Sequence, residues 1–286
     1  MNRGILLTAL SATLYGSIGY FGSTLIHQGM SVADMLFWRF AISSVLLLPF
    51  LPSLLKNKPD FKALFLLFIF GILFYGCGTA FYFEASKSIG TGLGMVIFFA
   101  YPIFVVCMSV FFHKTHLSTI TVASLALITL GCIFIACGQD FRADLLGILL
   151  ATLSGICYAL YLFCSKSTSL KVEPLLATFV VCLGSAAAFV FYRFLAQDSF
   201  YWPTTSFAWS HIFLFALVGT VLPVLFMLVG LKTLSAGKAS IISVLEPVTT
   251  LAVGALILHE AITPIQLLGA VIILSSAIIV QFDKQS

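Results

Sequence analysis

The sequence predicts an all-α membrane protein with ten transmembrane helices, arranged as two inverted five-helix repeats. Apolar residues make up 61% of the 286 residues and charged residues 8%, against about 45–50% and about 25% in soluble domains. The apolar segments run for about 20 residues, the length of a helix that crosses the hydrocarbon core, and lack the alternation of membrane barrel strands. The segment GILLTALSATLY, residues 4–15, recurs as GILLATLSGICY, residues 147–158.

The expected spans follow one another closely and leave no room for a soluble domain. Their ranges are 4–26, 34–55, 62–86, 91–113, 119–138, 145–166, 174–196, 209–234, 237–258 and 264–282. The longest polar connection, residues 197–208, carries Tyr201 and Trp202, which are side chains typical of the membrane interface. The expected repeats are residues 1–140 (helices one to five) and 141–286 (helices six to ten), together one integral membrane domain.

An odd number of spans in each repeat turns the second copy upside down relative to the first. This plan is typical of secondary transporters, in which two related bundles move about a site near the bilayer midplane. The first span is expected in the mature protein and not as a signal peptide, because its sequence recurs as an internal span and its apolar stretch is longer than a signal core.

The distribution of positive charge predicts that both termini lie in the cytoplasm. With that orientation the cytoplasmic connections hold ten basic residues: Arg3, Lys56, Lys58, Lys62, Lys114, Lys166, Lys171, Lys232, Lys238 and Lys284. The outer connections hold only Lys87, Arg142 and Arg193, and the side richer in Lys and Arg is the cytoplasmic one. The basic residues therefore require no nucleic-acid partner.

Polar and small side chains mark the faces that turn inward, because lipid is as apolar as leucine. The first span carries such residues at steps of three and four: Thr8, Ser11, Tyr15, Gly19 and Gly22. The sixth span does the same with Ser154, Tyr158, Tyr161 and Ser165. We expect Tyr15 and Tyr158 to approach one another across the pseudo-twofold axis. They either line a central path or belong to close helix packing with satisfied hydroxyls.

Two prolines occupy equivalent places in the repeats and predict helix bends at a central cavity. Pro102 and Pro247 fall within the fourth and ninth spans, where a proline removes a backbone hydrogen bond and bends the helix. The seven cysteines lie inside spans without a C-x-x-C pair, as expected of packing residues. The histidines lack metal-ligand spacing, and no nucleophile or phosphate-binding motif is present. We therefore expect no metal, no cofactor and no enzyme activity.

Three charges within the spans, Arg39, Glu84 and Glu246, are candidate functional residues, because a charge in lipid is costly unless it is paired or hydrated. At 1.5 Å per residue, Arg39 and Glu84 lie at a similar depth of about 6–9 Å from the outer surface. We expect them to form an ion pair or to share a hydration pocket, where they orient a solute. The alternative is an ion pair that only fixes helix packing.

Aromatic residues accompany these charges. Trp38 precedes Arg39, Tyr82 lies near Glu84, and Tyr101 precedes the proline of the fourth span. Aromatic rings beside an acidic group can hold an amine through charge and cation–π attraction, and a glutamate in apolar surroundings can carry a proton. Most of the aromatic residues are nevertheless expected to face lipid or the core. The expected substrate-binding residues are Tyr15, Trp38, Arg39, Tyr82, Glu84, Tyr101, Tyr158 and Glu246.

The stretch LEPVTTLAVGALILHEAITPIQLLGAVIILSSAIIV, Leu245–Val280, resembles the second-repeat pattern of the drug/metabolite transporter superfamily, in its EamA-type ten-helix branch. In the first repeat, Arg39 within WRFAISSVLLLP and the pair Tyr101-Pro102 resemble the corresponding pattern. The similarity covers essentially the whole chain. It implies transport of small metabolites across the bacterial inner membrane, often export of amino acids or related compounds.

The sequence therefore predicts a multi-pass secondary transporter of amino acids or related amines that works by alternating access. We expect export, or coupling to protons or to exchange, and a monomer or weak homodimer in the bilayer. A larger substrate such as S-adenosylmethionine or a nucleotide sugar, or a passive channel or facilitator, stays open as an alternative.

Overall fold

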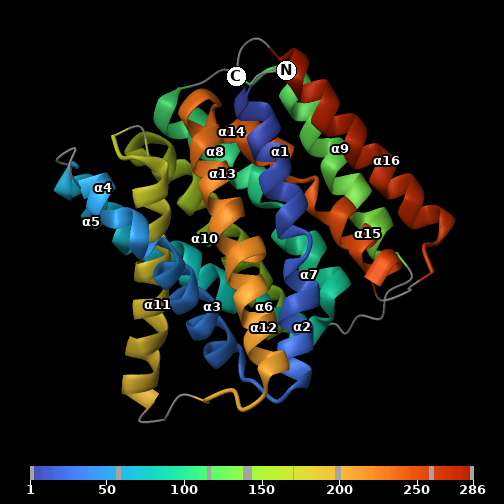
Figure 1. The fold of residues 1–286 in the computed structure, drawn as a ribbon. Coiled ribbons are helices and arrows are strands. Elements are labelled where there is room, and N and C mark those ends of the chain that lie inside the picture. The colour runs from blue at the N-terminus through green and yellow to red at the C-terminus, as the bar shows by residue number, and fades with distance from the viewer. Residues whose placement is uncertain are drawn as a thin grey trace.

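The computed structural model describes residues 3–55, 59–114, 117–137, 144–169, 171–196, 201–257 and 261–283. Within these ranges all regular elements are helical, and ten helical spans have the length and composition needed to cross a membrane (Figure 1). The prediction of an all-α protein with ten transmembrane helices is confirmed. We number the ten spans in chain order. The predicted boundary between the repeats, residues 140 and 141, lies outside the described residues.

Three spans are interrupted near their middle. Span 1 consists of α1 (Arg3–Tyr15) and α2 (Ile18–His27), span 4 of α7 (Thr91–Phe98) and α8 (Tyr101–His113), and span 9 of α14 (Ala236–Ser243) and α15 (Glu246–Ile257). Pro102 and Pro247 are the second residues of α8 and α15, positions where the missing N–H costs nothing. Span 1 breaks without a proline, at Gly16 and Ser17, where the Ser17 hydroxyl donates to the Leu14 carbonyl at 2.7 Å.

Two further spans contain a π turn at equivalent places. Span 3 consists of α5 (Phe61–Phe70), the π turn η2 (Gly71–Gly76) and α6 (Cys77–Ile89). Span 8 consists of α12 (Ser206–Ala216), the π turn η3 (Leu217–Val221) and α13 (Leu222–Thr233). A π turn disturbs the i→i−4 ladder and is often found at functional sites. Each repeat therefore carries one such turn in its third helix.

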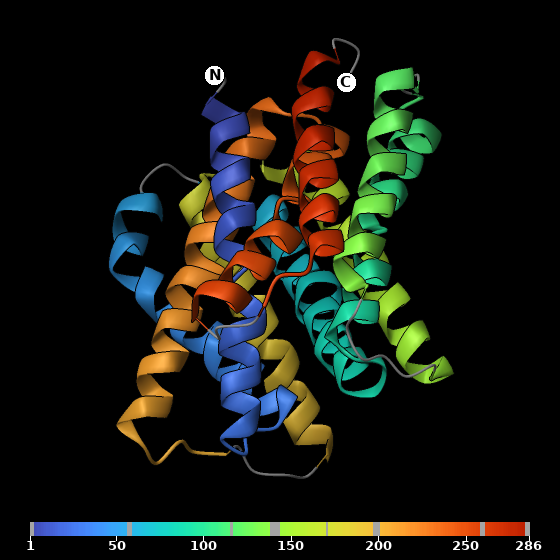
Figure 2. The ribbon, with the colours of Figure 1, turned by 90° about the vertical axis from the view of Figure 1, so that its right-hand side faces the viewer.

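The remaining spans are more regular. Span 2 comprises α3 (Val32–Leu47), the 3-10 turn η1 (Leu48–Phe50) and α4 (Leu51–Leu55). Spans 5, 6 and 7 are α9 (Thr119–Ala136), α10 (Leu145–Ser169) and α11 (Pro174–Ala196), and span 10 is α16 (Pro264–Ile279) with η4 (Val280–Phe282). Both described ends of the chain lie at the same end of the bundle (Figures 1 and 2), as an even number of crossings requires.

Equivalent contacts join the two repeats. The Ser11 hydroxyl of span 1 donates to the Pro223 carbonyl of span 8 at 2.7 Å, and the Ser154 hydroxyl of span 6 donates to the Gly78 carbonyl of span 3 at 2.7 Å. The first helix of each repeat thus packs on the third helix of the other. Because five crossings separate spans 1 and 6, these helices run in opposite directions.

Spans 5 and 10 form a third contact between the repeats, and small residues allow their close approach. A Cβ atom on Gly131 would lie 2.9 Å from the Gly269 carbonyl oxygen, and one on Gly269 would lie 2.7 Å from the Gly131 oxygen. The Ser276 hydroxyl of α16 donates to the Ser124 carbonyl of α9 at 3.0 Å. Such contacts drive helix association in lipid, where apolar burial gives no advantage.

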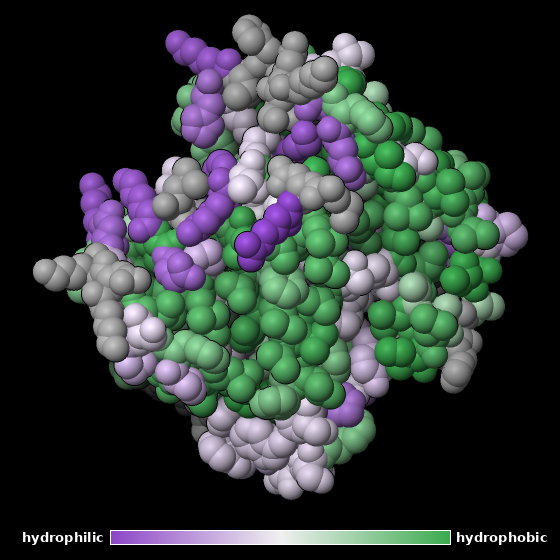
Figure 3. Space-filling model, turned by 45° about the horizontal axis from the view of Figure 1, so that its top comes forward, coloured by the Kyte–Doolittle hydropathy of each residue, from purple (hydrophilic) through white to green (hydrophobic). Residues whose placement is uncertain are grey.

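The surface is that of a multi-pass membrane protein. Hydrophobic side chains cover the flank of the bundle and hydrophilic ones gather at the end that carries the termini (Figure 3). Large apolar side chains on the flank are exposed, among them Phe65, Phe111 and Phe194. Of the basic residues in the topology argument, Lys56, Lys58, Arg142 and Lys284 lie outside the described residues.

Replacing Gly184 of α11 with alanine is expected to loosen the bundle. The new Cβ would lie 2.2 Å from the Phe68 carbonyl oxygen of α5, and backbone cannot yield as a side chain can. We expect a loss of about 1–3 kcal/mol, the usual cost of overpacking, seen as a lower midpoint of thermal unfolding in detergent. Gly19→Ala is the matched control, because its Cβ would meet no atom within 4 Å. Equal midpoints for the two variants would contradict this packing.

Candidate functional site

A cavity of about 50 Å³ lies in the middle of the bundle, where the interrupted spans meet. Its lining residues come from both repeats: Tyr15, Ile18, Arg39, Phe74, Tyr75, Gly78, Thr79, Tyr82, Phe98, Ser154, Tyr158 and Glu246. About 10–15 Å³ is enough for one water molecule. The cavity therefore has room for a few waters, and it must widen before it can accept a metabolite.

Tyrosines form one wall of this cavity and hold one another in place. The hydroxyls of Tyr15 and Tyr75 are 3.0 Å apart, and the ring of Tyr75 lies 5.0 Å from that of Tyr161. The ring of Tyr158 meets that of Tyr101 edge to face at 4.8 Å, a preferred aromatic geometry. Tyr15 and Tyr158, the equivalent tyrosines of the two repeats, thus line the same cavity, and Tyr101 supports it from behind.

Span 3 supplies a face that the sequence analysis recognised only in part. Tyr75, Gly78, Thr79 and Tyr82 line the cavity, and their spacing of three and four residues places them on one side of a helix. Of these four residues, only Tyr82 is among the expected substrate-binding residues, as a neighbour of Glu84. The three-and-four spacing of Tyr75, Thr79 and Tyr82 was the available signal.

The predicted pairing of Arg39 with Glu84 is wrong. Glu84 pairs with Lys87 of the same helix at 3.2 Å, and its side chain is 47% exposed. Arg39 and Glu84 lie at a similar depth along their helices, but depth does not determine the direction in which a side chain points around the helix axis. Glu84 follows the cavity-lining Tyr82 by two residues, which is about 200° of rotation on an α-helix. Glu84 therefore points away from the cavity.

Arg39 instead joins span 2 to the π turn of span 8. Its Nε donates to Thr220 Oγ1 at 2.6 Å and its Nη2 donates to the Gly219 carbonyl at 2.7 Å. The guanidinium carbon lies 4.3 Å from the ring centroid of Phe215, a cation–π contact. Arg39 is 1% exposed and borders the cavity. Its third nitrogen, Nη1, is buried without a hydrogen-bond partner.

Glu246 supplies the acidic group of the cavity. It is the first residue of α15, a position where the helix dipole favours a carboxylate. The hydroxyls of Thr249 and Thr250 donate to its backbone carbonyl at 2.9 and 3.0 Å. Gly16 at the break of span 1 packs against Thr249, since a Cβ there would lie 2.0 Å from Thr249 Oγ1. Glu246 thus lies where two interrupted spans meet.

Trp38 does not line the cavity but belongs to a cluster at the end of the bundle away from the termini. Its ring lies 4.8 Å from Trp202 and 5.0 Å from Trp209, and its Nε1 donates to the Tyr201 carbonyl at 2.8 Å. We name Trp38, Trp202 and Trp209 the tryptophan cluster. It holds the segment before α12 against α3.

A buried ion pair lies at the same end. Arg193 of α11 contacts Asp34 of α3 at 2.5 Å, and the side chains are 9% and 4% exposed. The other Asp34 oxygen accepts a hydrogen bond from the Tyr201 backbone N–H at 3.0 Å. Removing one partner of such a buried pair is strongly destabilising because it leaves an uncompensated charge. Polar contacts therefore join spans 2 and 7 at this end of the bundle.

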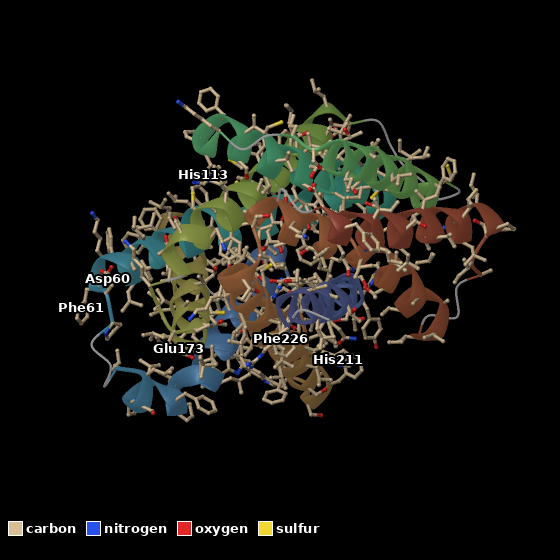
Figure 4. All side chains as sticks on the ribbon, turned by 90° about the horizontal axis from the view of Figure 1, so that it is seen from above. Asp60, Phe61, His113, Glu173, His211 and Phe226 are labelled. Carbon is tan, nitrogen blue, oxygen red and sulfur yellow. The ribbon has the colours of Figure 1, made fainter. Side chains whose placement is uncertain are left out.

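No metal-binding group is apparent in the described part of the chain, where no three His, Cys, Asp or Glu side chains come together. His113 and His211 lie far apart when the bundle is viewed from above (Figure 4). Asp60 and Phe61 lie at the rim of the bundle in the same view. Asp60 caps the N-terminus of α5, because its carboxylate accepts hydrogen bonds from the backbone N–H groups of Lys62 and Ala63.

The tryptophan cluster contains all three tryptophans of the chain. We therefore expect the tryptophan bands of near-ultraviolet circular dichroism, and tryptophan fluorescence, to report this end of the bundle. Trp38→Phe removes two of the three ring contacts in the cluster and is expected to weaken the tryptophan dichroism, while the Trp202–Trp209 contact at 5.6 Å is left. Phe98→Leu, which leaves the cluster untouched, is the control. A dichroism signal that survives Trp38→Phe unchanged would contradict the clustered arrangement.

Comparisons with known proteins agree with this architecture. A family model described as "EamA-like transporter family" matches residues 2–137 and again residues 145–282. An "Uncharacterized transporter" of Archaeoglobus fulgidus is 26% identical over 98% of this chain and 96% of its own length. The "Uncharacterized transporter YdfC" of Bacillus subtilis is 25% identical over 86% of this chain and 80% of its own.

A solved structure shares the fold. Described only as "Crystal structure of protein", it aligns with a TM-score of 0.78 at 16% identity and covers 96% of this chain and 95% of its own. The family model covers almost the whole chain in two halves. The chain therefore belongs to the EamA-like transporter family of the drug/metabolite transporter superfamily.

Proposed function

We propose that this transporter is a secondary active carrier of small polar metabolites, in particular amino acids or related amines, and that the central cavity is its substrate site. The observation that carries the proposal is the pair of charges at one cavity, Arg39 and Glu246. In the described part of the chain these two residues form no ion pair with each other. A small zwitterion supplies the opposite charge to each of them.

The remaining lining suits the other parts of such a molecule. Ile18, Phe74 and Phe98 provide apolar surface, and the tyrosine hydroxyls and Ser154 provide hydrogen-bonding groups. An ammonium group beside Glu246 also meets aromatic rings, which attract cations. S-adenosylmethionine or a nucleotide sugar would require a larger widening of the cavity than an amino acid does.

Polar contacts at both ends of the bundle support alternating access. The end away from the termini is held by the Asp34–Arg193 pair. At the other end, Asp283 accepts hydrogen bonds from the hydroxyls of Ser118 and Thr121, and Lys238 donates to its carbonyl at 3.0 Å. Contacts at both ends must break in turn for a solute to cross, and the interruptions of spans 1, 4 and 9 give those helices places to bend.

We further propose that the protein resides in the bacterial inner membrane with both termini in the cytoplasm. The support is the excess of lysine in the connections on that side and the hydrophilic end seen in Figure 3. Export, or coupling to protons or to exchange, is consistent with Glu246 as a half-buried carboxyl group at the cavity. Saturable counterflow would separate this carrier from a passive channel or facilitator.

Glu246→Gln is expected to impair transport severely, whereas Glu84→Gln is expected to leave it unchanged. Loss of one charge-assisted contact to the substrate lowers affinity by about tenfold or more. The measurement is counterflow in proteoliposomes with a panel of radiolabelled amino acids and amines. Glu84→Gln is the matched control, since the same chemical change falls on a residue outside the cavity. Normal counterflow by Glu246→Gln, or loss of transport in Glu84→Gln, would refute the placement of the site.

A further inference from the structure

We propose that Arg39 binds the carboxylate group of the substrate through Nη1, and that Thr220 and the Gly219 carbonyl hold Arg39 in the required orientation. This inference rests on the proposed function and adds to it the class of substrate, a carboxylate-bearing zwitterion, and the residues that select it. It starts from a polar atom that the fold leaves unsatisfied.

The unsatisfied atom is Nη1 of Arg39. Two of the three guanidinium nitrogens are hydrogen-bonded, Nε to Thr220 and Nη2 to Gly219. Nη1 has no partner although Arg39 is 1% exposed. Buried donors are almost always paired, and an unpaired one costs free energy, especially when it is charged. A ligand that accepts from Nη1 in the widened cavity removes this penalty.

Comparison of the two repeats shows that helix packing does not require this arginine. In the second repeat, the Ser185 hydroxyl of α11 donates to the Gly71 carbonyl at the π turn of span 3 at 2.9 Å. In the first repeat, the Ser43 hydroxyl of α3 contacts the Ala216 carbonyl beside the π turn of span 8 at 3.2 Å. Serine thus makes the equivalent interhelical contact in both repeats.

Arg39 of the first repeat has no charged counterpart in the second repeat. By the offset of the sequence repeat its position falls near Cys182 of α11, where Val181 and Cys182 are both fully buried and uncharged. The second repeat therefore joins its π turn to the neighbouring helix without a cation. A buried charge that the duplicated scaffold does not need is best explained by a ligand.

The π turn gives Arg39 a fixed direction. The Gly219 carbonyl accepts from Nη2 and Thr220 Oγ1 accepts from Nε, and both acceptors belong to the π turn η3. The guanidinium carbon lies 4.3 Å from the ring centroid of Phe215 and 5.1 Å from that of Phe40. With two nitrogens hydrogen-bonded and two rings in contact, rotation of the guanidinium is restricted, and Nη1 is the nitrogen left for a ligand.

The chemistry of that ligand follows from the charges. A guanidinium offers N–H donors only and matches carboxylate or phosphate oxygens. Glu246 lies in the same cavity, so a phosphate dianion would leave an excess of negative charge. A carboxylate joined to an ammonium group satisfies Arg39 and Glu246 together and leaves the site neutral. A simple amine would satisfy only Glu246.

The experiment compares each amino acid with its own α-amide, which keeps the ammonium group and the side chain but loses the carboxylate charge. The twenty L-amino acids and their α-amides are screened by thermal shift on the purified protein, and dissociation constants are measured for the best pair. We expect the acid to bind about tenfold or more tightly than its amide, as loss of a charged contact implies.

Four variants then assign the preference to residues. In Arg39→Gln the ratio of amide to acid dissociation constants is expected to fall to about one, as the loss of the charged contact implies, and in Arg39→Lys to an intermediate value. Thr220→Val keeps the shape but removes the acceptor for Nε, so the ratio falls although Arg39 is present. Thr220→Ser keeps the hydroxyl and restores the ratio. A merely structural role of Thr220 would change thermal stability without changing the ratio.

The outcomes separate this inference from the proposed function. If acids and amides bind the wild-type protein equally, or if folded Arg39→Gln keeps the preference for acids, the inference is overturned and the carrier function stands. If no compound of either series binds the wild-type protein, the proposed amino-acid substrate is refuted and the inference with it. Should Arg39→Gln fail to fold, the wild-type ratio and the pair of Thr220 variants decide the question.

Discussion

The close approach of helices from opposite repeats is the constraint on which the rest of the structure depends. Within a bilayer apolar burial does not favour helix association, so contacts rest on small residues and on hydroxyls that reach backbone carbonyls. Ser11 and Ser154 make such contacts at equivalent places, and Gly131 and Gly269 allow spans 5 and 10 to touch. These contacts fix the positions of spans 1, 3, 6 and 8 and thereby the central cavity.

On this duplicated scaffold the charges are distributed unequally. Arg39 falls near an uncharged cysteine in the other repeat, and Glu246 falls at the position of Tyr101 in the first repeat. The interruptions are unequal as well, because span 1 breaks at Gly16 whereas span 6 is the single helix α10. The cavity is thus built by two similar repeats but carries a basic residue from one, Arg39, and an acidic residue from the other, Glu246. This unequal distribution of charge suits the recognition of an asymmetric molecule.

Much of the fold was accessible from the sequence, because hydropathy and length determine spans in a membrane protein. Tyr15 and Tyr158 were recognised as inward-facing from their three-and-four spacing, which reports rotation about the helix. Arg39 and Glu84 were paired from depth alone, which says nothing of rotation, and that pairing failed. The partners of Arg39 could not be predicted from the sequence. Gly219 and Thr220 lie in a π turn about 180 residues further along the chain, and their contact with Arg39 arises only in the folded structure. Trp38 was misplaced for a related reason, because its partners Trp202 and Trp209 are distant in sequence.

The unequal lengths of the spans have a consequence for the surrounding lipid. Span 3 contains 29 residues and span 5 contains 18, so at 1.5 Å per residue they are about 43 Å and about 27 Å long. The hydrocarbon core is about 30 Å thick, so the longer helix must tilt or extend beyond it while the shorter one barely spans it. A change in bilayer thickness acts on the tilt of span 3 first. Since that span contributes Tyr75, Thr79 and Tyr82 to the cavity, the length of the lipid chains becomes a factor that acts on the proposed substrate site.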